Sequence, residues 1–95
     1  MPETPPPSAT TISWAYCNRG VCYGKLEDHQ QAIQDYDEAI NWDPQEAKAY
    51  NNRGYAYGDL GQYERAIQDY DEAIRLDPQG VKTYYNRGYA YEALG

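Results

Sequence analysis

Few residues of this 95-residue chain could do chemistry. It has one histidine, His29, and two cysteines, Cys17 and Cys22. The cysteines lie five residues apart in a stretch with helical periodicity, which turns their side chains about 140° apart around the helix axis. That angle excludes a disulfide between them and a shared metal site, so we expect two free thiols. We interpret His29 as a surface or half-buried residue at the start of a helix.

Two matching acidic clusters are the remaining candidates: Asp35, Asp37 and Glu38, and Asp69, Asp71 and Glu72. Carboxylates hold a cation when they converge, as in a calcium loop with its turn glycine. On a helix these side chains spread over a wide arc instead, so we interpret both clusters as a solvated outer face. The sequence also has no glycine-rich phosphate loop, no Ser-His-Asp set and no metal-ligand spacing. We therefore predict neither an enzyme nor a bound cofactor.

A repeat organises the rest of the chain. The pattern Tyr-x-Asn-Arg-Gly stands at residues 16–20, 50–54 and 84–88, each copy 34 residues after the last. Residues 15–45 and 49–79 are identical at 20 of 31 aligned positions. A repeated supersecondary unit cannot bury its own apolar face and must stack on its neighbours. The period therefore predicts an array of packed units.

Each full unit contains two stretches with helical periodicity. We expect helices at residues 13–26, 29–42, 47–60, 63–76 and 81–94. The spacing of Ala66, Tyr70 and Ala73 is typical of one buried stripe. Gly61 can end a helix in a left-handed conformation, and the proline that follows Asp43 cannot continue one. No alternation of apolar and polar residues predicts a strand.

These residues resemble the tetratricopeptide repeat. The signature positions hold Tyr16, Gly20, Tyr23, Ala32, Tyr36, Ala39 and Pro44, then Tyr50, Gly54, Tyr57, Ala66, Tyr70, Ala73 and Pro78, then Tyr84, Gly88 and Tyr91. The resemblance covers residues 13–95, as units 13–46 and 47–80 and a half unit 81–95. It implies an all-α fold, a right-handed α-solenoid of five helices in antiparallel pairs.

Two features of the repeat have consequences for packing. The family's usual leucine is replaced by Arg19, Arg53 and Arg87, for which we expect solvent-reaching or ion-paired sites. A glycine inside a helix costs about 1 kcal/mol relative to alanine. Its recurrence in the pattern therefore indicates close approach of a neighbouring helix. Glu27 replaces the turn glycine of the first unit, where we expect a less favourable turn.

Composition limits the environment and the partners. Residues 1–12 hold four of the six prolines and show no apolar periodicity, so we expect a disordered or extended lead-in. The chain has neither the pattern of a signal peptide nor the apolar length of a membrane span. We expect a soluble, cytoplasmic protein that binds no membrane. Nucleic acid is not an expected partner, because no basic stripe accompanies the net charge of −7.

The resemblance also implies where a ligand binds. In the family, the first helices of successive units line a concave groove, and the matching positions here are Trp14, Asn18, Lys48, Asn52, Tyr55, Lys82, Tyr85, Asn86 and Tyr89. The recurring amides of Asn18, Asn52 and Asn86 form a ladder. Such a ladder suits an extended peptide whose backbone groups hydrogen-bond to the amides. A helix-to-helix or capping role for the same amides stays open.

The family's dicarboxylate clamp, which holds an acidic chaperone tail, is not expected. Asn52 and Lys82 match its pattern, but Cys17, Val21 and Asn86 do not. The charge of the ligand stays undetermined, because the family's groove positions in this chain carry both signs: Lys25, Lys48 and Lys82 against Asp59 and Glu92.

The alternative to a peptide-binding module is a structural unit that assembles with copies of itself. No second helix follows residues 81–94, so at least one aromatic flank of this helix should face water. The residues it offers are Tyr84, Tyr85, Tyr89, Ala90, Tyr91 and Leu94. Exposed apolar surface of this kind recruits partners. We therefore expect self-association through this helix, with a two-fold homodimer preferred over helix exchange or open head-to-tail stacking.

Overall fold

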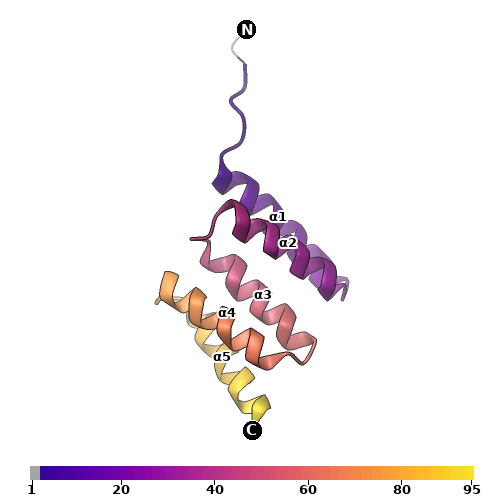
Figure 1. Cartoon of the computed structure of the whole chain (residues 1–95), viewed down its shortest axis with the longest axis vertical. Helices are drawn as coiled ribbons and strands as arrows, with labels where there is room; N and C mark the ends of the chain where they lie inside the picture. The colour runs from indigo at the N-terminus through magenta and orange to yellow at the C-terminus, as the bar shows by residue number, and fades with distance from the viewer. Residues whose placement is uncertain (1–2) are drawn as a thin grey trace.

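A computed structural model describes residues 3–95 of the chain, which form five α-helices joined by short turns. They are α1 (Ala9–Lys25), α2 (His29–Trp42), α3 (Ala47–Asp59), α4 (Tyr63–Leu76) and α5 (Val81–Leu94). No strand occurs in residues 3–95. The helices follow one another from the N-terminal to the C-terminal end of an elongated molecule (Figure 1). This arrangement confirms the predicted all-α solenoid of helix pairs.

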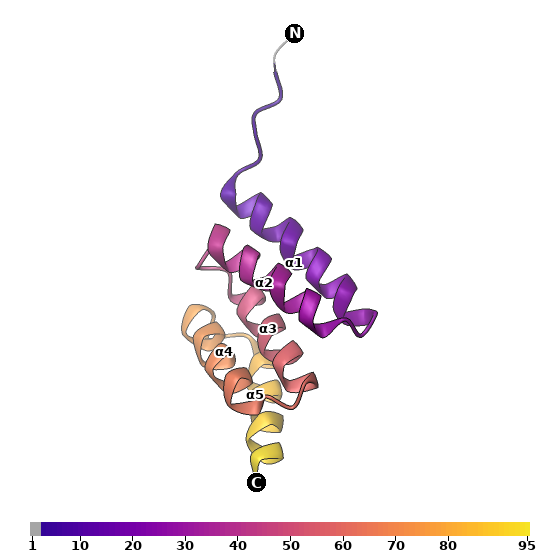
Figure 2. The same ribbon diagram turned by 45° about the vertical axis from the view of Figure 1, so that its right-hand side comes forward.

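Each helix packs mainly on its neighbours in sequence. The closest pairs are α1 with α2 and α3 with α4, which are the two helices of one unit (Figure 2). In addition α3 contacts both α1 and α5, so the three first helices share one side of the molecule. Within the described residues, no helix combines the length and the apolar character that crossing a membrane requires.

The first helix begins earlier than predicted. Its N-cap is Ser8, whose side-chain oxygen accepts a hydrogen bond of 3.1 Å from the backbone N–H of Thr11. A serine in this role satisfies one of the free backbone donors at a helix start. The predicted lead-in is therefore wrong for residues 9–12, which are helical. Residues 3–8 have no regular structure, and residues 1–2 of the lead-in lie outside the described residues.

Tyrosine rings seated on glycines hold the two helices of each unit together. A Cβ atom built on Gly20 would lie 2.6 Å from Cε1 of Tyr36, and one on Gly54 would lie 2.8 Å from Cε1 of Tyr70. Both rings are buried, among alanines that let the helices approach. The predicted close approach is confirmed at these two glycines. It is wrong for Gly88, because none of the five helices covers that face of α5.

The turn of the first unit has the strain that the sequence indicated. Glu27 has a φ of 63°, the left-handed conformation that Gly61 adopts in the second unit with a φ of 76°. A side chain in this region costs free energy that glycine avoids. The two turns therefore have the same backbone conformation, but the turn of the first unit costs more conformational free energy.

Arginine and aspartate connect the helices in a pattern that repeats. Nε and Nη2 of Arg19 donate to Asp35 at 2.9 and 2.7 Å, and the same atoms of Arg53 donate to Asp69 at the same distances. Nη1 of Arg53 also donates to Asp37 of the preceding unit, at 2.8 Å. These contacts confirm that the arginines are ion-paired. Each guanidinium also lies over the tyrosine ring three residues before it, at 5.5 to 5.7 Å from the centroid.

The acidic clusters form the predicted solvated face only in part: Asp37, Glu38 and Asp71 are exposed, but the first aspartate of each cluster is buried. Asp35 is 1% exposed and Asp69 is 6% exposed, each under the arginine of its own unit. Among the other carboxylates, Asp37 and Asp71 are exposed and bind the arginine of the next unit. The prediction failed for the two buried aspartates because helical spacing alone does not reveal a cation that packs opposite from another helix.

Burial raises the pKa of the Asp69 carboxyl, although Arg53 beside it acts in the opposite direction. A carboxyl whose pKa rises on folding stabilises the folded state at acidic pH, and this contribution is lost as the pH rises through the folded value. The ion pair is therefore not a large net source of stability at neutral pH. Its consequence is that neither charge can be removed alone without leaving the other buried and unpaired.

We expect Arg53→Leu to lower the free energy of unfolding at pH 7 by about 3 to 5 kcal/mol, because it strands the buried Asp69 carboxylate. The double variant Arg53→Leu/Asp69→Leu should regain most of the loss. The loss in the single variant should shrink at acidic pH, where Asp69 takes up a proton. Urea denaturation at several pH values measures all three. A double variant no more stable than the single one contradicts this account.

A pair of glycines on one helix tests the tyrosine contact. Gly54→Ala should destabilise the fold by roughly 1 to 3 kcal/mol, because the new methyl overlaps the Tyr70 ring. Gly58→Ala is the matched control: no atom lies within 4 Å of its Cβ position. It should stabilise α3 by up to about 1 kcal/mol through helix propensity. Thermal melts that shift in the same direction for both variants would show that the tyrosine contact is not tight.

Candidate peptide-binding groove

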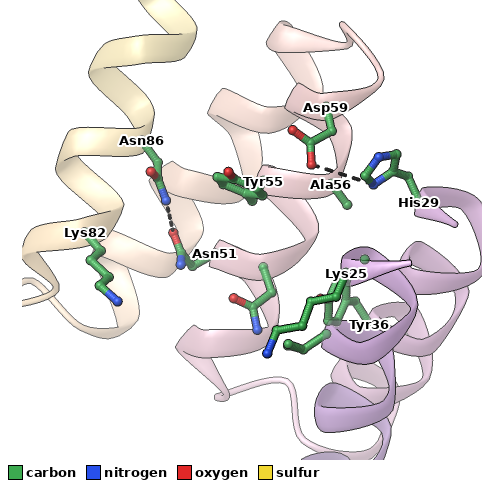
Figure 3. A pocket seen from close by; sticks show the side chains of 12 residues that line it. Lys25, His29, Tyr36, Asn51, Tyr55, Ala56, Asp59, Lys82 and Asn86 are labelled. Carbon is green, nitrogen blue, oxygen red and sulfur yellow. Dashed lines mark hydrogen bonds and ion pairs between the residues drawn. The ribbon is translucent and has the colours of Figure 1, made fainter. Parts of the chain in front are cut away.

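The side of the molecule formed by the three first helices is hollowed into two adjoining cavities. One has a volume of about 380 Å³ and lies between α1 and α3, with Lys82 and Asn86 of α5 at its edge (Figure 3). The other has a volume of about 430 Å³ and lies among α3, α4 and α5. Tyr55, Asp59 and Asn86 line both cavities. The two cavities therefore form one continuous groove.

The lining of the groove repeats with the 34-residue period of the sequence. Every residue that lines the second cavity lies 34 residues after a residue that lines the first. Tyr36 and Ala56 of the first cavity, for example, are followed by Tyr70 and Ala90 in the second. The same backbone arrangement thus forms two equivalent cavities, one after the other along the groove.

The chemistry of the two cavities differs. Three substitutions between the units make the second cavity aromatic: Val21 becomes Tyr55, His29 becomes Tyr63 and Asn51 becomes Tyr85. The first cavity has charged, imidazole and amide side chains instead, from Lys25, His29, Asn51, Asn52 and Lys82. The groove therefore runs from a cavity with two lysines to one lined by tyrosines.

Most of the predicted groove residues lie on these cavities. Those that do are Asn52, Tyr55, Lys82, Tyr85, Asn86 and Tyr89. Trp14, Asn18 and Lys48 line neither of them. Asn18 and Lys48 precede Asn52 and Lys82 by one repeat, so they would belong to a cavity on the other side of α1. Such a cavity needs another first helix, and the described residues contain none before α1.

Two of the ladder asparagines already bridge helices. Nδ2 of Asn52 donates to Sγ of Cys17 at 3.5 Å, and Nδ2 of Asn86 donates to Oδ1 of Asn51 at 3.4 Å. The helix-to-helix role that the sequence left open is therefore real. Both contacts are long, and within residues 3–95 the two amides form no other side-chain hydrogen bond. Each amide keeps its oxygen and one N–H for a ligand.

Charge in the groove comes from a small set of groups. Burial raises the pKa of the Cys17 thiol and of the Tyr36 and Tyr70 hydroxyls, so all three stay neutral near pH 7. Lys25 and Lys82 are the cations of the first cavity, and Asp59 is its carboxylate. The balance is slightly positive in a chain whose net charge is −7.

His29 is half-buried at the start of α2, as predicted, but sequence reasoning did not place it on the groove. Its Nδ1 is buried, lies 3.6 Å from Oδ2 of Asp59, and has no hydrogen-bond partner among the described residues (Figure 3). A buried polar atom without a partner is uncommon in folded proteins. Sequence reasoning assigned the groove to first helices only, whereas His29 and Tyr63 start second helices. Their equivalence in the repeat was the available signal.

Comparison with known families matches most of the chain to one kind of repeat. Models described as tetratricopeptide repeat match residues 13–45 and 35–68, and a model described as TPR repeat matches residues 54–95. Among curated protein sequences none matches.

Solved structures with the same architecture are similar over nearly the whole chain. The first TPR of Spaghetti (RPAP3), bound to the HSP90 peptide SRMEEVD, is 28% identical with a TM-score of 0.88, over 90% of this chain and 68% of that one. The Arabidopsis OM64 TPR domain is 31% identical with a TM-score of 0.89, over 92% and 72%. The second TPR of Spaghetti, bound to the same peptide, is 31% identical with a TM-score of 0.88, over 90% and 80%. With its repeat, its helix pairs and these relatives, the chain belongs to the tetratricopeptide repeat family.

Proposed function

We propose that this chain is a protein-interaction module that binds an extended peptide along the groove of α1, α3 and α5. The observation that carries the proposal is the pair of joined cavities, which offers amide, amine and tyrosine side chains along one continuous path. Two of the similar structures hold a peptide, the HSP90 peptide SRMEEVD. That likeness supports a peptide as the ligand class.

The two cavities would receive two side chains of one peptide. Lys25 and Lys82 suit an acidic or polar side chain in the first cavity. The tyrosines of the second cavity suit an aromatic or proline ring, because they offer flat apolar faces with a hydroxyl at the edge. Between them, Asn52 and Asn86 would pair with the peptide backbone.

The mode of binding differs from the dicarboxylate clamp of the family. Cys17 is buried at the position where the clamp needs a cation, and Val21 stands where it needs an asparagine. The buried thiol also accepts from Asn52, which occupies part of the amide. The proposal therefore needs no carboxylate at the end of the ligand.

Asparagines at equivalent positions provide the test. A peptide-array screen with the labelled chain should give ligands, and Asn52→Ala should weaken their binding by about 0.5 to 1.5 kcal/mol, since one hydrogen bond is lost. Asn18→Ala is the matched control, because the same change then falls outside the cavities. Titration calorimetry with the best array peptide measures the difference. Equal affinity for both variants, or a screen without ligands, would count against the groove.

Self-association through α5 is a second candidate function. Tyr84, Tyr91 and Leu94 are 42%, 53% and 45% exposed on this helix. The other residues of the expected flank lie elsewhere: Tyr85 and Tyr89 line the groove, and Ala90 is buried. The exposed set is smaller than the sequence indicated, but it is contiguous in helical spacing and apolar.

Light scattering across a hundredfold range of concentration tests this candidate. The average mass should rise from one chain toward two, because pairing removes the α5 tyrosines from water. Tyr91→Lys should keep the chain monomeric, whereas the groove variant Tyr89→Lys should behave as the parent does. A constant monomer mass for the parent at the highest concentration would rule out association by this route.

A further inference from the structure

The two cavities of the groove differ in charge at equivalent positions. Lys25 lines the first cavity, and the residue one repeat later, Asp59, lines the second. Among the described residues that line the second cavity, Asp59 is the one charged side chain. Five tyrosines surround the same space. The second cavity is therefore aromatic and anionic, although the first contains two lysines.

The Asp59 carboxylate acts on the tyrosines of this cavity. Asp59 follows Tyr55 by four residues on α3, so both side chains lie on one face of the helix (Figure 3). Burial raises the pKa of the Tyr70 hydroxyl, and Tyr55 and Asp59 act in the same direction. The charge of Asp59 therefore reaches the buried ring of Tyr70 as well as the exposed ring of Tyr55.

This carboxylate is free to accept hydrogen bonds from a ligand. Nδ1 of His29 lies 3.6 Å from Oδ2 of Asp59, and the two groups form no hydrogen bond. No lysine or arginine of residues 3–95 forms an ion pair with Asp59. The Asp59 side chain is 38% exposed, so a group from outside the chain can contact it.

Elsewhere the chain combines tyrosine and aspartate with a guanidinium. Arg19, Arg53 and Arg87 each lie over a tyrosine ring at 5.5 to 5.7 Å and donate to an aspartate at 2.7 to 2.9 Å. A guanidinium suits both partners, because it is planar, stacks on an aromatic face and presents parallel N–H groups to a carboxylate. The second cavity offers tyrosines and a carboxylate, but none of the chain's five arginines lines it.

We propose that the second cavity is a subsite for the guanidinium of an arginine side chain in the bound peptide. The guanidinium would stack on the Tyr55 ring and donate to the Asp59 carboxylate. Tyrosine faces alone accept an aromatic or proline ring as well, but only a cation also uses the carboxylate beside them. The inference rests on the proposed peptide binding and names the side chain that the peptide places in this cavity.

Arginine fits this subsite better than lysine does. A lysine ammonium is a compact and strongly hydrated charge, so it loses more hydration when it enters a cavity lined by tyrosines. A guanidinium is more weakly hydrated and can form two parallel hydrogen bonds to Asp59 while its plane lies on a ring. We therefore expect the subsite to bind arginine more tightly than lysine, and lysine more tightly than a neutral side chain.

Amino-acid derivatives test the subsite without a peptide ligand. The isotope-labelled full chain is titrated with the amide of N-acetylarginine and followed by NMR. The backbone amide signals of residues 55–59 should shift to saturation, because the guanidinium binds beside them. The amide of N-acetylcitrulline is the matched control, since citrulline has nearly the shape of arginine without its charge. It should bind at least about tenfold more weakly.

Substitutions taken from the first unit test the two residues of the subsite. Asp59→Lys and Tyr55→Val introduce the side chains that Lys25 and Val21 have at equivalent positions, so both are compatible with the fold of a unit. Each should weaken binding of the arginine derivative about tenfold. Glu92→Lys makes the same change of charge on an exposed side chain that lines neither cavity, and it should bind as the parent does.

Three results would overturn the inference. The absence of saturable shifts with the arginine derivative would remove the subsite, while peptides that bind the parent more tightly than Asn52→Ala would still support the groove. Equal binding of the citrulline derivative, or equal binding to Asp59→Lys, would show that the cavity does not recognise charge. Tighter binding of the amide of N-acetylphenylalanine would assign the cavity to an aromatic ring. Saturable binding of the arginine derivative beside a peptide screen without ligands would support the subsite and count against the groove proposal alone.

Discussion

The contact of a tyrosine ring with a glycine backbone sets the distance between the helices of each unit. Tyr36 on Gly20 and Tyr70 on Gly54 leave no space for even one methyl group. Because both units have this contact, α1 and α3 lie in equivalent positions on their second helices. The repeated groove depends on this equivalence, since its floor is formed by the same two rings. A change at either glycine would therefore act on stability and on the binding surface together.

The arginine–aspartate pairs restrict how the helices can stack on one another. The Arg53 guanidinium binds a carboxylate of its own unit and one of the preceding unit, so it connects α3 to both α4 and α2. Two buried charges contribute little net stability, but a misplaced helix would leave one of them unpaired. The pairs thus favour one register of stacking. Arg87 repeats the contact between units, because its Nη1 donates to Asp71 as Nη1 of Arg53 donates to Asp37.

Near-identity of two units does not make their surfaces alike. Some positions that face the groove differ between the units, as Val21 and Tyr55 or His29 and Tyr63 do, while others, such as Tyr36 and Tyr70, are the same. One backbone arrangement thus carries a cavity with lysine and amide side chains beside a cavity lined by tyrosines.

The sequence by itself determined the elements and their order, because helical periodicity, caps and the repeat are local properties of the chain. It also indicated that the arginines are paired and that Gly20 and Gly54 meet a neighbouring helix. Tertiary structure decided what each side chain faces. It buried Asp35 and Asp69, placed His29 in a cavity and left Asn18 outside one, since burial depends on the helix that packs opposite. A 34-residue period predicts that units stack, but only the stacked helices show which side chains a neighbouring helix covers.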